Sequence, residues 1–279
     1  MSAFLWAVLI PALLPVLFIF LYIYRADKNE REPIRFVLKV MLMGAIFALP
    51  CAFIESAMES LLQGFYDPES IEYGFMENTV GVALIEELSK WLVFMFFVWK
   101  SKDFDHTFDG IVYGASASLG FAAIENVMYV IDYGTSVSIT RAIFSIPGHT
   151  TFGLFMGYYM SRAKMRSVNK KIIGLAKLKA LLVPTLLHGI YDFLLSEQAG
   201  NLTYLFIFYV IFLDVISWKL IKKQSKKDES FYRGENRRNP FGKSQNQDVL
   251  ESDDTPDFED DSDNNSDYDS DDDSNDFSE

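Results

Sequence analysis

Seven long apolar stretches alternate with short polar segments along most of this chain. They cover about residues 3–24, 36–62, 78–99, 108–131, 141–161, 180–196 and 201–221. A helix of about 20 residues crosses the roughly 30 Å hydrocarbon core of a bilayer, and a helix satisfies its own backbone there. The pattern therefore predicts an all-α membrane helix bundle of about seven transmembrane helices, in which the short sixth stretch is tilted or partly re-entrant.

The first apolar stretch resembles a retained transmembrane helix more than a signal peptide. A signal peptide has a basic segment before its apolar run and small residues at a cleavage site after it. Here neither is evident, and basic residues follow the run instead, at Arg25, Lys28, Arg31 and Arg35. We therefore expect this stretch to stay in the membrane.

The loop charges alternate, and this alternation predicts the orientation. Basic residues are found in segments 25–39, 100–102, 162–179 and 222–227. No Lys or Arg occurs in segments 63–77, 132–140 and 197–200. Basic loops stay on the cytoplasmic side of membrane proteins. The N-terminus is thus predicted to lie outside, and the C-terminus in the cytoplasm.

The negative charge of the chain is concentrated at one end. The formal net charge of the 279 residues is −13, yet 16 acidic residues and no Lys or Arg lie between Asp248 and Glu279, so residues 1–247 carry +3. Such a tail cannot bury a core and is predicted to be disordered. We predict a membrane domain over 1–223, a basic juxtamembrane segment over 224–247 attracted to anionic lipid, and an acidic tail over 248–279. Nucleic acid is not an expected partner.

Polar residues interrupt four of the predicted helices. They are Glu86 with Glu87, Glu125 with Asn126, His149, and His188 with Asp192. Ionisable groups are costly inside a membrane and usually mark a functional site. At a rise of 1.5 Å per residue, all lie roughly 9–14 Å below the outer face, although their helices run in opposite directions. We therefore expect a single site.

The spacing of these residues suggests how they pair. Glu86 and Lys90 are four residues apart and can form an ion pair on one helix face. His188 and Asp192 have the same spacing, so Asp192 can orient the imidazole. Each pair has a purely structural alternative, a packing contact between helices.

Three other polar positions are given structural interpretations. We expect Glu55 and Glu59 to be interfacial, and Asp109 to serve the start of its helix. His106 is expected to be a solvated loop residue. Glycines spaced four apart, Gly110 with Gly114 and Gly153 with Gly157, predict close helix packing.

Adjacent carboxylates with two imidazoles suit peptide hydrolysis. A glutamate can take a proton from water while a histidine donates to the developing oxyanion. Alternatively His149, His188 and Glu125 could hold Zn²⁺, with another glutamate as the base. The sequence has no HExxH and no GxSxG motif. A proton- or ion-coupled transporter and a catalytically inactive membrane scaffold remain alternatives.

Five motifs in order resemble the PrsW family of intramembrane proteases, which is distantly related to the CAAX-processing membrane proteases. They are Glu86-Glu87-Leu-Ser-Lys90, Asp109-Gly-Ile-Val-Tyr-Gly114, Gly120-Phe-Ala-Ala-Ile-Glu125-Asn126, Pro147-Gly148-His149-Thr-Thr-Phe-Gly153 and His188-Gly-Ile-Tyr-Asp192-Phe193. The resemblance covers about residues 1–220 and does not include the acidic tail.

This resemblance implies a multi-pass endopeptidase of the bacterial inner membrane. Its substrate would be a single-span membrane protein, such as an anti-sigma factor that is first cut near the outer face. The implied catalytic residues are Glu86, Glu87, Glu125, His149 and His188. Lys90, Asn126 and Asp192 would support them, and the chemistry would be of the glutamate type or depend on a metal.

Overall fold

The computed structural model describes residues 2–28, 30–165 and 170–231. The tail predicted over 248–279, and most of the predicted segment 224–247, lie outside the described residues. Within them the only β feature is an isolated bridge between His106 and Ser230. All other regular structure in the described ranges is helical, as predicted.

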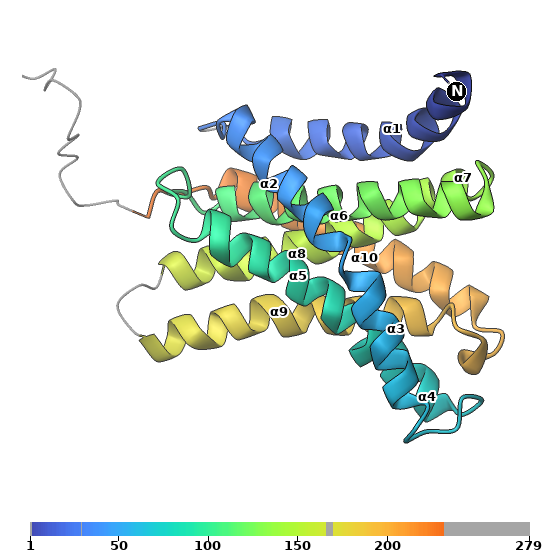
Figure 1. Cartoon of the computed structure of the whole chain (residues 1–279). Helices are drawn as coiled ribbons and strands as arrows, with labels where there is room; N and C mark the ends of the chain where they lie inside the picture. Colours follow the sequence, from blue (N-terminus) through green and yellow to red (C-terminus); the bar gives the residue numbers. More distant parts are fainter. Residues whose placement is uncertain (1, 29, 166–169, 232–279) are drawn as a thin grey trace, which may run out of the picture. The chain divides into compact units, whose positions relative to one another are not determined.

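The helices follow one another with short connections (Figure 1). The α-helices are α1 (Ser2–Ala26), α2 (Ile34–Ala48), α3 (Cys51–Leu62), α4 (Ile71–Met76), α5 (Leu84–Val93), α6 (Asp109–Tyr133), α7 (Val137–Ile143), α8 (Ser145–Met165), α9 (Lys170–Phe193) and α10 (Thr203–Lys226). Two π-helical turns, η1 (Glu77–Ala83) and η2 (Phe94–Val98), flank α5, and a 3₁₀ turn, η3 (Glu197–Ala199), precedes α10.

Five described segments are long and apolar enough to cross a membrane. They are Leu9–Ala26, Ile34–Leu62, Asp109–Tyr133, Lys170–Phe193 and Thr203–Lys226. The second is divided into α2 and α3 at Pro50, which lacks the N–H that a continuous helix needs. The chain is therefore a multi-pass membrane protein by the length and composition of these helices.

Helix α9 is longer than the sequence pattern predicts. It begins at Lys170, whereas the apolar stretch begins at residue 180. Lysine is a good helix former, and its apolar stem can lie along other side chains. Lys177 places its ammonium 3.5 Å from the centre of the Trp99 ring, and its carbonyl accepts a hydrogen bond of 3.1 Å from Trp91 Nε1. The basic loop predicted over 162–179 is thus partly helical.

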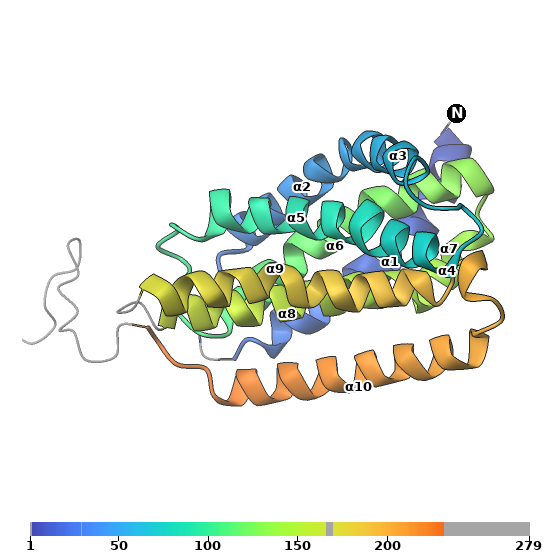
Figure 2. The ribbon, with the colours of Figure 1, turned by 90° about the horizontal axis from the view of Figure 1, so that it is seen from below.

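Helix α6 lies at the centre of the bundle, between α1, α2 and α8 (Figures 1 and 2). Of its apolar span, 78% is buried. Helix α8 approaches it so closely that a Cβ atom on Gly114 would overlap Gly153 and Gly157. The close packing predicted from the glycine spacing is confirmed.

Replacing Gly157 by Leu is expected to destabilise the protein by about 1–3 kcal/mol, because the added atoms overlap the backbone at Gly110. Thermal unfolding in detergent measures the change. Gly174→Leu is the matched control, since no atom lies within 4 Å of a Cβ at that position in α9. An equal shift in both variants would contradict the role given to the α6–α8 contact.

The connections gather at two ends of the bundle. One end holds the loops after α1 and η2 and the chain after α10, and the other holds α4, α7 and the turn before α10 (Figures 1 and 2). At the first end Thr107 N donates to Glu229 O at 3.0 Å, and Phe231 N donates to Asp105 O at 2.8 Å. The start of the predicted segment 224–247 therefore packs on the loop before α6.

Candidate active site

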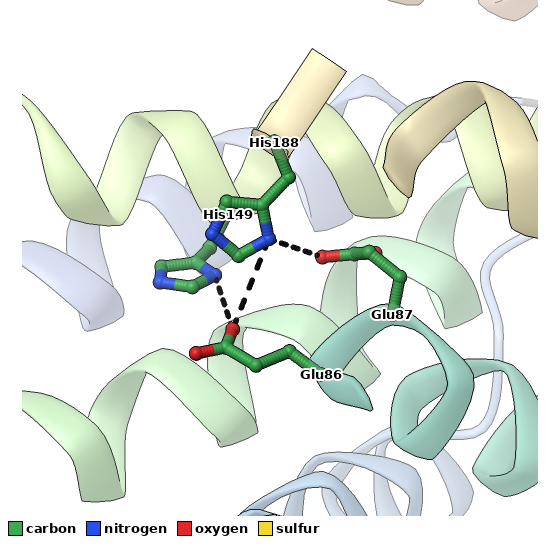
Figure 3. A group of neighbouring side chains, drawn as sticks. All are labelled: Glu86, Glu87, His149 and His188. Atoms are coloured by element: carbon green, nitrogen blue, oxygen red, sulfur yellow. Dashed lines mark hydrogen bonds and ion pairs between the residues drawn. The ribbon is translucent and has the colours of Figure 1, made fainter. Parts of the chain in front are cut away.

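Two wide helical turns position the adjacent glutamates. The π-helical turn η1 ends at Ala83, and η2 begins at Phe94, so both border the helix that carries Glu86 and Glu87. Such turns inside α-helices are frequent at functional sites. Both glutamates are buried, and their side chains point toward the imidazoles of α8 and α9 (Figure 3).

Lys90 is fully buried, and its ammonium contacts both glutamates and His149. Nζ lies 2.7 Å from Glu87 Oε1, 3.2 Å from Glu86 Oε2 and 3.1 Å from His149 Nδ1. The Phe121 ring centre is 4.3 Å from Nζ. A buried charge costs several kcal/mol unless it is paired. The predicted Glu86–Lys90 ion pair is confirmed, and Glu87 shares the same ammonium.

The contacts of His149 define its tautomer. An ammonium is a donor only, so Nδ1 accepts from Lys90 and the ring hydrogen is on Nε2. Nε2 lies 2.8 Å from Glu125 Oε2. His149 thus connects the carboxylate of α6 to the lysine of α5, and it keeps a lone pair on Nδ1.

His188 lies between two carboxylates. Its Nδ1 is 3.1 Å from Glu87 Oε1, and its Nε2 is 3.1 Å from Asp192 Oδ2, the partner expected from the spacing. The Phe152 ring stacks on the imidazole, with ring centres 4.6 Å apart. These contacts fix the orientation of the ring and keep water from one of its faces.

Glu125 is held by a residue that sequence reasoning missed. Arg141, on the short helix α7, places a guanidinium nitrogen 2.9 Å from Glu125 Oε1. Its Nε donates to Asn126 Oδ1 at 3.0 Å, and Asn126 donates in turn to Ala12 O at 2.8 Å. Asn126 therefore lies outside the group of glutamates and histidines and acts on it through Arg141. No spacing rule links Arg141 to Glu125, because α7 is a separate helix.

A cavity of about 850 Å³ leads to only part of this cluster. Its lining includes Glu86, Glu125, His149 and His188, but neither Glu87 nor Lys90. It extends to residues at the ends of α6, α9 and α10, namely Asp132, Tyr133, Leu195, Ser196 and Thr203. Glu86 is therefore the glutamate of the adjacent pair that a substrate can reach.

Glu55 also lines this cavity, which corrects the expectation that it is interfacial. Its Oε1 is buried and accepts no hydrogen bond. The orientation of α3 brings Glu55 inward, whereas Glu59 is exposed. An acidic residue within an apolar stretch was the available signal.

The donor groups of the cluster suit a metal ion. Glu86, Glu87, His149 and His188 each offer an atom, and these atoms lie within 4.8 Å of one another. Nδ1 of His149 and Nδ1 of His188 lie 3.8 and 3.9 Å from the same oxygen, Glu86 Oε2 (Figure 3). Glu87 Oε2 is buried without a hydrogen-bond partner. Two nitrogens and carboxylate oxygens are typical ligands of Zn²⁺.

A carboxylate lies at Nε2 of each imidazole, on the side away from Glu86. Glu125 lies at Nε2 of His149, and Asp192 lies at Nε2 of His188. Metal-binding histidines usually have such a partner on the nitrogen that does not bind the metal. Glu125 is therefore placed to orient His149. The group of close donor atoms contains Glu86 and Glu87 but not Glu125, which the sequence analysis considered as a ligand.

Comparison with known proteins identifies the family of this chain. Residues 32–216 match the family model described as PrsW family intramembrane metalloprotease. Protease PrsW of Oceanobacillus iheyensis is 38% identical over 221 residues, which are 79% of this chain and 97% of the relative. Protease PrsW of Bacillus subtilis is 31% identical over 81% of this chain and 97% of its own length, and no solved structure matches. The chain is therefore a member of the PrsW family of intramembrane proteases.

Proposed function

We propose that this protease cleaves a single-span membrane protein near the outer face of the membrane, and that Glu86 activates the attacking water. The cavity carries the proposal, because it exposes Glu86 and both imidazoles while it leaves Glu87 and Lys90 sealed. A base must come within hydrogen-bond reach of the proton that it removes. Glu86 meets this requirement better than Glu87.

Glu86 would take a proton from water as the water oxygen attacks the carbonyl carbon of the scissile peptide. The proton would then pass from Glu86 to the leaving nitrogen as the C–N bond breaks. The Lys90 ammonium lies 3.2 Å from Glu86 Oε2 and would hold that carboxyl group in position. Phe152 and the buried helix faces restrict the access of other water.

We propose that His149, His188 and Glu87 hold Zn²⁺, so that Glu86 is left as the base. When bound, such an ion polarises a carbonyl group and lowers the pKa of water. The tautomer of His149 supports this proposal, because its Nδ1 has a lone pair and no hydrogen to donate to an oxyanion. Glu125 and Asp192 would orient the two rings.

We propose seven membrane spans, with the N-terminus outside and the C-terminus in the cytoplasm. The continuous helical stretch from α4 to η2 and helix α8 would be the two further spans beside the five apolar segments. Their polar site residues lower their hydropathy below that of the other five. The alternation of basic loops supports this orientation. The cavity reaches the base-free loops, which supports cleavage near the outer face. An anti-sigma factor in a bacterial inner membrane is the proposed substrate class.

The His149→Ala variant is expected to cleave a candidate single-span anti-sigma factor about 10²–10⁴-fold more slowly than the wild type. Both proteins are reconstituted in lipid vesicles, and the products are identified by mass spectrometry. His106→Gln is the matched control, since the loop between η2 and α6, which contains His106, lies at the opposite end of the bundle from α4 and α7 (Figure 1). Wild-type rates in His149→Ala would refute the proposed site.

Metal analysis of the same proteins distinguishes metal-dependent hydrolysis from a glutamate mechanism without a metal. The wild type should contain about one zinc per chain and lose cleavage in a chelator, while His149→Ala should lose the zinc. A zinc-free wild type that cleaves at full rate would exclude the metal and leave the glutamate mechanism.

A further inference from the structure

Buried carboxylates gather at the end of the bundle opposite the cavity. Asp27 follows α1, Glu32 precedes α2, and Asp109 begins α6; their exposed fractions are 1%, 4% and 0%. Each offers one oxygen, and these oxygens lie within 4.8 Å of one another. Three acidic side chains, two from the α1–α2 connection and one from the start of α6, therefore lie close together and are shielded from solvent.

These carboxylates lack the cationic partners that such burial normally requires. Among the described residues, no Lys or Arg nitrogen lies within 4.0 Å of Asp27, Glu32 or Asp109. Both oxygens of Asp27, and Oδ1 of Asp109, are buried without a well-formed hydrogen bond; the Glu32 N–H approaches Asp27, and the Glu32 carboxyl group approaches Asp109. A buried carboxylate without a partner costs several kcal/mol. These neighbouring oxygens are therefore available to a ligand.

The remaining contacts of the cluster add little positive charge. Asp109 Oδ2 accepts from the N–H groups of Asp105 and His106, and Glu32 accepts from the Tyr113 hydroxyl. His106 is buried, which corrects the expectation that it is solvated, and its Nδ1 lies 2.7 Å from Asp105 Oδ1.

A fourth carboxylate adds negative charge nearby. Asp228, after α10, accepts from Phe108 N at 2.8 Å. Burial, together with this neighbouring charge, raises the pKa of Asp27 to about 6. His106 and Arg31 lower the pKa of Asp27, but burial and the negative charge of Asp228 outweigh them.

We propose that Asp27, Glu32 and Asp109 bind a hard divalent cation of the Mg²⁺, Mn²⁺ or Ca²⁺ class. All the available ligands are oxygens, which these ions prefer, whereas the cluster at Glu86 also offers imidazole nitrogens. The bound ion joins the end of α1, the start of α2 and the start of α6. It therefore stabilises the bundle at a distance from the catalytic cavity, and the inference does not depend on the proposed cleavage.

Mn²⁺ is the probe for this site. The full chain is purified in detergent and stripped of metal, and Mn²⁺ binding is followed by electron paramagnetic resonance. Asp27→Asn is expected to weaken the tight Mn²⁺ site at least about tenfold, because affinity follows the number of charged ligands. Glu30→Gln, which removes an exposed carboxylate from the same loop, should bind as the wild type does. Residues 248–279 are unchanged in every variant, so ions bound there are common to all.

Thermal unfolding with Mg²⁺ and Mn²⁺ binding by further variants test the assignment of the ion to this cluster. Mg²⁺ should raise the unfolding temperature of the wild type and of Glu30→Gln, but not that of Asp27→Asn or Glu32→Gln. Loss of the tight Mn²⁺ site in His149→Ala instead of Asp27→Asn would assign the ion to the catalytic cluster and overturn the proposal. Unchanged Mn²⁺ binding in folded Asp27→Asn and Glu32→Gln would also overturn it, and would indicate carboxyl groups that share protons.

Discussion

The Glu86→Gln variant should cleave its substrate about 10²–10⁴-fold more slowly than the wild type, because an amide cannot take a proton from water. The substitution keeps the shape of the side chain and removes only its basicity. Single-turnover cleavage in vesicles measures the chemical step apart from substrate entry. Substrate binding should change little, since the apolar walls of the cavity remain.

Glu87→Gln is the informative comparison for this variant. Glu87 is fully buried and does not line the cavity, and it contacts Lys90 and His188. If Glu87 holds Zn²⁺, its substitution lowers both metal content and activity. Glu86→Gln should instead retain the metal while it loses activity. Full activity in Glu86→Gln would exclude Glu86 as the base and leave Glu87 as the candidate.

Lys90→Met should destabilise the protein by about 3–5 kcal/mol, because Glu86 and Glu87 are then buried without their ammonium. Methionine has a similar volume, so the loss reports charge more than packing. Unfolding by a denaturing detergent, followed by tryptophan fluorescence, measures the change. Lys39→Met is a matched control, because Lys39 is an exposed lysine on α2.

A second substitution tests whether the unpaired charge of the glutamates causes the loss of stability in Lys90→Met. In the double variant Lys90→Met with Glu87→Gln, one buried negative charge is removed, and part of the lost stability should return. The coupling energy of such neighbours is typically 0.5–3 kcal/mol. If the double variant is less stable than Lys90→Met alone, the ion pair is not the source of the stability.

The sequence predicted those features that depend on local spacing. The pairs Glu86–Lys90 and His188–Asp192 follow from the rise of a helix, and the contact of α6 with α8 follows from glycines four apart. That the glutamates and histidines would meet followed from their similar depth in the membrane. The roles of these residues in catalysis remain predictions.

Features that depend on helix packing could not be predicted. The contact of Arg141 with Glu125 requires the position of α7, which is too short to produce an apolar pattern. Glu55 faces inward because the chain breaks at Pro50 and α3 takes a new direction. Asp27 and Glu32 lie in the connection between α1 and α2, whereas Asp109 begins α6, and only the fold brings the three together.

The backbone-to-backbone approach of α6 and α8 limits how this family can vary in sequence. Apart from the small side chains of Ser118 and Ser161, the glycines at the crossing bring backbone against backbone, so the separation of Glu125 from His149 depends mainly on main-chain geometry. Lipid-facing positions on α10 or α1 contribute little to that separation, since only 28% and 22% of these spans, respectively, is buried. Homologues can therefore replace much of their outer surface, to suit different bilayers, without altering the reactive centre.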